Sequence, residues 1–124
     1  MKALYDNLRA NYKNLRVTVD KTVSDGQELP ICGGIKVIHT PGHTPGHICL
    51  YLPEHKILFA GDALNVDAEH LVRSPVFTTT DPAAYKESIK KLTQYDIETV
   101  VCFHGGVFNR DPNHRIAEIV SELG

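Results

Sequence analysis

The segment HTPGHTPGH, residues 39–47, is the feature that most limits how this chain can fold. It repeats a histidine at every fourth position, a spacing that would place three imidazoles on one face of a helix. Each gap, however, holds a proline followed by a glycine, and these residues interrupt a helix. We therefore predict a sharply turned loop, and the question is why such a loop carries three imidazoles.

Strand-like segments lie on both sides of this loop. Residues 35–40 (IKVIHT) run into it, and residues 47–52 (HICLYL) leave it. Residues 56–62 (KILFAGD) follow after a turn at residues 53–55 (PEH). These segments predict an antiparallel meander with one largely buried face.

The remaining segments extend this sheet and connect it. Residues 98–103 (ETVVCF) are apolar enough for a buried strand that ends in a loop at residues 104–106 (HGG). Residues 3–14 follow a helical spacing, and residues 16–20 alternate as a short strand. Residues 63–80 show no pattern and are expected to be irregular.

Two helices are predicted by their first residues. Asp81-Pro82 and Asp111-Pro112 each place a carboxylate at a helix cap and a proline at the first helical position. Apolar residues at helical spacing follow each pair. The 124 residues are therefore expected to form one α/β domain.

Composition narrows the classes of function. The net charge is −2 and no basic block is present, which argues against a nucleic-acid or anionic membrane partner. No apolar run is long enough to cross a bilayer, and the first residues lack the apolar core of a signal peptide. Cys32, Cys49 and Cys102 are odd in number and widely spaced, so we expect three buried thiols in a reducing, cytoplasmic environment.

Three predicted strands end in residues that suit metal chemistry. His43 follows the first of these strands, Asp62 ends another, and His104 follows the strand at residues 98–103. Imidazole with carboxylate is a common ligand set for zinc or non-haem iron. Ligands at rigid strand ends are held precisely in place, as a metal site requires.

The segments TPGHTPGHICLY (40–51), ILFAGDAL (57–64) and VCFHGGV (101–107) together resemble the metallo-β-lactamase-fold hydrolases, including their glyoxalase II-like branch. The resemblance covers most of the chain from about residue 34 onward. It implies half of an αββα sandwich, a mainly antiparallel sheet with helices on one face, that corresponds to the C-terminal half of the family's domain. The family's HxHxDH motif is absent from this sequence.

The resemblance also implies roles for individual residues. His43 matches the third histidine of the first metal site, Asp62 the carboxylate that bridges two metals and takes part in catalysis, and His104 the histidine of the second site. His39 and His47 are expected to support these ligands by hydrogen bonding or packing next to them. Cys102 is interpreted as a core thiol, with a ligand role left open.

The activity implied is hydrolysis by a metal-bound water or hydroxide of a small thioester, lactone, β-lactam or related ester. Zinc is the expected metal, with iron or manganese possible. Because the ligands of HxHxDH are missing, we expect partial metal binding and no activity from this chain alone. Two alternatives stay open: a shortened, non-catalytic relative that serves as a dimeric binding or structural module, and a metal-dependent oxidoreductase of the same fold.

The resemblance bears on partners as well. Half of a sandwich leaves the inner face of its sheet uncovered, and an apolar face of that size calls for a partner. We expect either self-association or an N-terminal half supplied separately.

Overall fold

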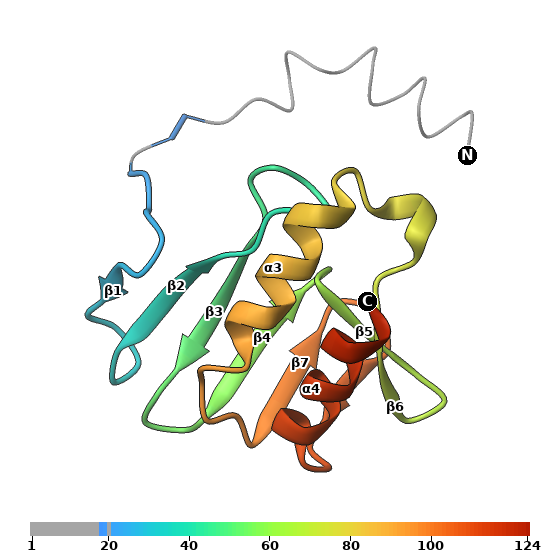
Figure 1. The fold of residues 1–124 in the computed structure, drawn as a ribbon. Coiled ribbons are helices and arrows are strands. Elements are labelled where there is room, and N and C mark those ends of the chain that lie inside the picture. Colours follow the sequence, from blue (N-terminus) through green and yellow to red (C-terminus); the bar gives the residue numbers. More distant parts are fainter. Residues whose placement is uncertain (1–17, 20) are drawn as a thin grey trace, which may run out of the picture.

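The computed structural model describes residues 18–19 and 21–124 (Figure 1). The helix predicted at residues 3–14 lies outside the described residues, as does most of the strand predicted at residues 16–20. Thr18 and Val19, the described part of that strand, are not in a strand.

A six-stranded sheet forms the body of the fold, in the order β1-β2-β3-β4-β7-β8. The pairing of β4 with β7 is parallel, and the other pairings in this sheet are antiparallel. The predicted meander is therefore correct, and its members are β2, β3 and β4. The bounds are β1 Glu28–Leu29, β2 Ile35–His39, β3 Ile48–Leu52, β4 Ile57–Gly61, β7 Thr99–Cys102 and β8 Gly106–Phe108.

The prediction that residues 63–80 are irregular is wrong. Strands β5 (Leu64–Asp67) and β6 (His70–Arg73) form an antiparallel hairpin, and a short 3-10 helix, η1, spans Val76–Thr78. The hairpin turns at Ala68 and Glu69, which have φ values of 49° and 66°. Glycine or asparagine usually occupies such positions, so the sequence carries no hairpin signal there.

Helices α3 (Pro82–Leu92) and α4 (Pro112–Glu122) lie on the same face of the sheet (Figure 1). Between them and the sheet is the core, in which alternate strand residues meet the apolar stripes of both helices. The core includes Ile38, Leu58 and Val100 from the sheet and Tyr85, Ile89, Leu92, Ile116 and Ile119 from the helices. None of the helices in the described part of the chain is long and apolar enough to cross a membrane.

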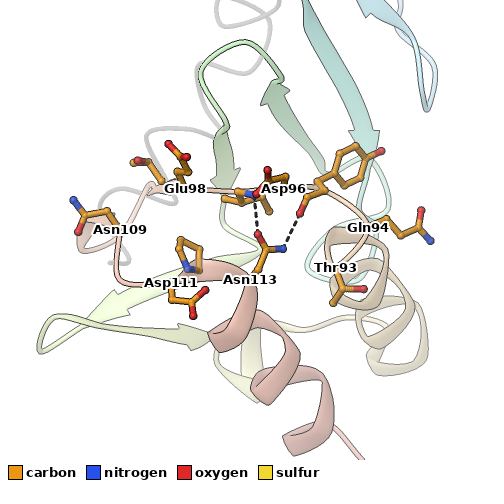
Figure 2. Close-up of a pocket in the computed structure, with 11 residues that line it drawn as sticks. Thr93, Gln94, Asp96, Glu98, Asn109, Asp111 and Asn113 are labelled. Carbon is orange, nitrogen blue, oxygen red and sulfur yellow. Dashed lines mark hydrogen bonds between the residues drawn. The ribbon is translucent and has the colours of Figure 1, made fainter.

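The two helices begin where the sequence predicts, but they begin differently. The Asp81 carboxylate accepts a hydrogen bond of 3.1 Å from the Ala84 N–H, as a capping residue should. Asp111 has a left-handed backbone (φ 49°), and its side chain caps none of the described N–H groups. Asn113 anchors α4 instead, accepting from the Ile97 N–H and donating to the Tyr95 carbonyl, each at 2.7 Å (Figure 2).

Replacing Asp81 by alanine is expected to lower the free energy of unfolding by about 1 kcal/mol, because one N–H of the first turn loses its partner. Urea denaturation measures this loss. Asp111→Gly is the matched control, since it removes no cap bond and glycine suits the left-handed backbone, so its stability should be unchanged or slightly higher. Equal losses in the two variants would show that the Asp81 cap bond does not stabilise α3.

Candidate functional site

The three predicted ligands come together at one edge of the sheet. Asp62 follows β4 and His104 lies in the turn after β7, and these strands run parallel, so both residues reach the same edge. The loop between β2 and β3 brings His43 there. The Nε2 atom of His43 lies 3.7 Å from Asp62 Oδ2, and the Nε2 atom of His104 lies 3.2 Å from Asp62 Oδ1.

The Pro-Gly loop is held against the start of α3. The Ser88 hydroxyl donates to the Pro41 carbonyl at 2.7 Å, and the Thr80 N–H donates to the Gly42 carbonyl at 2.8 Å. A side chain at position 42 would lie 2.5 Å from the Tyr85 Cα, and the φ there is 139°. Only glycine allows this approach, and that approach fixes where His43 stands.

The main chain of Asp62 is held at both ends. Its N–H donates to His47 Nε2 at 3.1 Å, and its carbonyl accepts a short hydrogen bond from the buried Ser74 hydroxyl. Gly61 has a φ of 57°, and a Cβ there would lie 2.9 Å from the same His47 nitrogen. The Asp62 carboxylate is thus carried by a backbone with little freedom to move.

The hydrogen bonds of His47 fix its protonation state. Because Nε2 accepts from the Asp62 N–H, the proton of the neutral ring lies on Nδ1, which is 2.8 Å from the Thr40 hydroxyl oxygen and donates to it. Burial of the ring lowers the pKa of His47, against the attraction of the Asp62 carboxylate. The ring is therefore a neutral hydrogen-bond acceptor for Asp62.

The His104 turn is clamped to the β5–β6 hairpin. The Val66 N–H donates to the His104 carbonyl at 3.0 Å. Gly105 has a φ of 93°, and a Cβ there would lie 1.8 Å from the Val66 carbonyl oxygen. The hairpin that the sequence did not predict is therefore what positions one of the predicted ligands.

The polar atoms of the site fit metal ligation in part. In the described residues, Oδ1 of Asp62 and Nδ1 of His43 are buried without a hydrogen-bond partner, although His104 Nε2 is 3.2 Å from that oxygen. Buried acceptors are seldom left unpaired, and an ion is one explanation for such a group. The two carboxylate oxygens face different imidazoles, which suits two metal positions that share Asp62.

The same geometry limits what these residues can hold. Among the described residues, no group of three or more His, Cys, Asp or Glu side chains is arranged around one metal position. Each oxygen of Asp62 faces one histidine, so each position has two protein ligands. A catalytic zinc usually has three, and the ligand roles of His43, Asp62 and His104 remain predictions.

A cavity of about 230 Å³ opens onto this site. Apart from Asp62 and the two histidines, the residues that line the cavity are uncharged. The lining residues are His43, Asp62, Asn65, Ser74, Pro75, Thr78 and His104.

The wide polar hollow of Figure 2 lies next to Thr99, at the start of β7, whereas the candidate site follows the end of that strand. The hydrogen-bonding groups of Asn113 in this hollow are satisfied by the main chain. We therefore place the candidate site at the sheet edge where His43, Asp62 and His104 meet.

The other predicted residues have structural places. His39 Nε2 lies 2.8 Å from the Pro45 carbonyl oxygen and braces the loop itself. Cys102 is in the core, where burial raises the pKa of its thiol to about 12 and disfavours a ligating thiolate. Cys49 is buried as expected, but Cys32 is exposed in a turn, so that part of the prediction is wrong.

Sequence reasoning missed the groups that hold the ligands in place. Thr40, Ser74 and Tyr85 are buried polar residues, and the Tyr85 hydroxyl donates to the Ala63 carbonyl just after Asp62. Asn65, in the cavity wall, lies in a segment whose sequence predicts no role for it. Ser74 lies in a segment without any motif.

Comparisons with known proteins agree with this fold. The profile of the metallo-beta-lactamase superfamily matches residues 3–104. A hydroxyacylglutathione hydrolase from Brucella anthropi is 39% identical over 88 residues, which are 69% of this chain and 32% of that protein. An atrochrysone carboxyl ACP thioesterase from Emericella nidulans is 30% identical over 122 residues, 97% of this chain and 36% of the relative. The chain thus spans about a third of the length of these curated relatives.

Solved structures show the same fold. A metallo-beta-lactamase from Pontibacter korlensis matches with a TM-score of 0.67 and 25% identity, over 93% of this chain and 53% of that one. A metallo-beta-lactamase family protein from Thermus thermophilus matches with a TM-score of 0.64 and 22% identity, over 96% of this chain and 44% of that one. The predicted α/β fold and the family resemblance are confirmed, and the chain spans about half of each solved structure.

The protonation state of His47 can be checked directly. Nitrogen NMR of isotopically labelled protein near neutral pH should show a protonated Nδ1, an unprotonated Nε2 and a scalar coupling between Nε2 and the Asp62 amide nitrogen. A protonated Nε2 without that coupling would contradict the assigned hydrogen bonds.

The clamp at Gly105 gives a second test. Gly105→Ala is expected to lower the free energy of unfolding by about 2–4 kcal/mol, because the methyl group meets the Val66 carbonyl on a left-handed backbone. Gly46→Ala is the control, since a Cβ there meets no described atom within 4 Å and the stability should change by less than about 0.5 kcal/mol. Thermal unfolding of both variants measures the difference, and a tolerated Gly105→Ala would show that the clamp is loose.

Proposed function

The chain belongs to the metallo-beta-lactamase superfamily, and on that premise we propose that His43, Asp62 and His104 are its contribution to a metal-dependent hydrolase centre. One observation carries the proposal. The two oxygens of a single, backbone-fixed carboxylate face two different imidazoles at 3.7 and 3.2 Å. A carboxylate so placed can serve two metal positions at once.

The donor set favours zinc, and iron or manganese accept the same nitrogen and oxygen ligands. When bound, such a metal supplies a water of lowered pKa and polarises the oxygen of the group under attack. The residues of this chain fix the geometry around it. His47 and Ser74 hold the Asp62 backbone, the α3 contacts hold the His43 loop, and the β5–β6 hairpin holds His104.

We propose a thioester as the substrate class. The relative matched over 97% of this chain is named a thioesterase. The cavity beside Asp62 has room for a small acyl group, and apart from Asp62 and the histidines its wall is uncharged, which suits a neutral carbonyl. Lactone and β-lactam hydrolysis need the same attack on a carbonyl and are the closest alternatives within this proposal.

A non-catalytic role is the second candidate, and one observation favours it. Two protein ligands for each position, in the described residues, are fewer than catalytic zinc uses. A chain that binds a metal weakly, or not at all, would serve as a binding or structural module. The two candidates differ in whether Asp62 governs turnover.

Zinc binding tests the ligand assignment. Calorimetric titration should show weak binding, and Asp62→Asn should weaken it by about 10-fold or more, because the amide keeps the shape but loses the charge. His114→Ala is the matched control, since its ring is exposed on α4 beside Glu118 and does not line the site cavity, and its zinc affinity should equal that of the wild type. Equal affinities in the wild type and Asp62→Asn would contradict the assignment.

Hydrolysis of S-acyl glutathione by the zinc-loaded chain tests the activity. Turnover that is lost in Asp62→Asn and kept in His114→Ala supports the hydrolase. Zinc binding that depends on Asp62, without turnover of thioester, lactone or β-lactam probes, would favour the non-catalytic candidate.

A further inference from the structure

Three polar side chains connect the main chain of Asp62 to the interior of the sheet through a continuous series of hydrogen bonds. The series begins at the Asp62 N–H and ends at the Ala60 carbonyl. Between these ends lie His47, Thr40 and Cys49, in that order. The successive donor–acceptor distances are 3.1, 2.8, 3.4 and 3.7 Å, and the two longer ones involve sulfur. Thr40, Cys49 and Ala60 are buried, and His47 is half-buried.

The strand pairing places these side chains together. The pairing of β2 with β3 continues one step toward the loop, where the Thr40 N–H donates to the His47 carbonyl at 2.9 Å. Residues that face each other across two strands have neighbouring side chains. Cys49 lies two residues after His47, so its side chain is on the same face of the strand. The series therefore crosses the sheet from the end of β2, over the start of β3, to the end of β4.

The two ends of the series fix its direction. The Asp62 N–H can only donate, and the Ala60 carbonyl can only accept. Each side chain between them must then accept from one neighbour and donate to the next. His47 donates from Nδ1 to the Thr40 hydroxyl, which donates to Cys49 Sγ. The Cys49 thiol donates to the Ala60 carbonyl, and burial raises the pKa of this thiol to about 11, so it keeps the proton that it donates.

Thr40 decides which nitrogen of His47 carries the proton. The hydroxyl hydrogen of Thr40 has two acceptors, Cys49 Sγ and the His47 carbonyl, each at 3.4 Å. With either acceptor, the hydroxyl oxygen is left to accept from Nδ1 at 2.8 Å. If the hydroxyl donated to Nδ1 instead, the ring proton would lie on Nε2 and would oppose the Asp62 N–H. Only the first arrangement pairs every donor in the series.

We propose that Thr40 is a positioning residue of the candidate site, which acts on Asp62 through the His47 ring. By accepting the Nδ1 proton, Thr40 keeps Nε2 free for the Asp62 N–H. That bond holds the main chain just after the register shift at the end of β4. Cys49 completes the series, so its buried thiol does more than fill the core. The effect on metal binding rests on the proposed function, whereas the series rests only on these contacts.

Thr40→Val tests the proposal, because valine has nearly the same shape but accepts no hydrogen bond. A buried Nδ1–H without an acceptor destabilises the ring in its present position. In isotopically labelled, metal-free protein, the scalar coupling between His47 Nε2 and the Asp62 amide nitrogen should be lost. Hydrogen exchange of the Asp62 amide should become about 10-fold faster or more, relative to the Leu58 amide in β4. The ratio to Leu58 removes any general loss of stability.

Three further variants complete the test. Thr40→Ser keeps the hydroxyl and should restore both the coupling and the slow exchange of the Asp62 amide. Thr40→Ala also lacks the hydroxyl and should behave like Thr40→Val, so it replaces that variant if valine prevents folding. Thr99→Val is the matched control, since it makes the same change at the start of β7, away from the candidate site, and should leave the coupling in place.

Two results would overturn the proposal. One is an unchanged coupling and an unchanged exchange ratio in Thr40→Val. The other is a Thr40→Ser variant that behaves like Thr40→Val, because the shape of the side chain and not its hydroxyl would then position the ring.

Zinc titration of the same variants separates this proposal from the metal centre. The zinc affinity should fall by about 10-fold in Thr40→Val and return in Thr40→Ser, as expected for a group that supports a ligand through another residue. A lost coupling with unchanged zinc affinity would uphold the role of Thr40 and contradict the ligand role of Asp62. Because the coupling is measured without metal, a chain that binds no zinc contradicts only the metal centre.

Discussion

The parallel pairing of β4 with β7 is the constraint on which the candidate site depends. Parallel strands end at the same sheet edge, so Asp62 and His104 meet although they are far apart in the sequence, and Asp62 Oδ1 lies 3.2 Å from His104 Nε2. The register shifts at the end of this pairing, where Gly61 takes a left-handed backbone beside His47. That shift turns the Asp62 main chain toward His47 and aims the carboxylate between two imidazoles.

The residues proposed for the site could be singled out because each follows a local sequence pattern. A Pro-Gly loop, a Gly-Asp at a strand end and a His-Gly-Gly after a strand are visible without a structure. His47 was expected as support, and its bond to the Asp62 N–H shows one form that such support can take. The spacing of four in HTPGHTPGH carries no helical meaning. His39 lies against the Pro45 carbonyl, His43 against the Asp62 carboxylate, and His47 accepts from the Asp62 N–H.

The supporting shell could not be predicted, for physical reasons. The β5–β6 hairpin turns on Ala68 and Glu69 with positive φ, and tertiary contacts override the preference for glycine there. Ser74 binds the Asp62 carbonyl from a segment without periodicity. Likewise Asp111 resembles Asp81 in sequence, yet Asn113 anchors the helix by reaching the loop before β7. These are long-range contacts, and local pattern does not encode them.

The central claim is that one rigid carboxylate serves two metal positions. Anomalous diffraction at the zinc edge from zinc-soaked crystals tests it most directly. Two peaks are expected, one between Asp62 Oδ2 and His43 and one between Asp62 Oδ1 and His104. Zinc bound elsewhere on the chain, with neither Asp62 oxygen as a ligand, would contradict the claim.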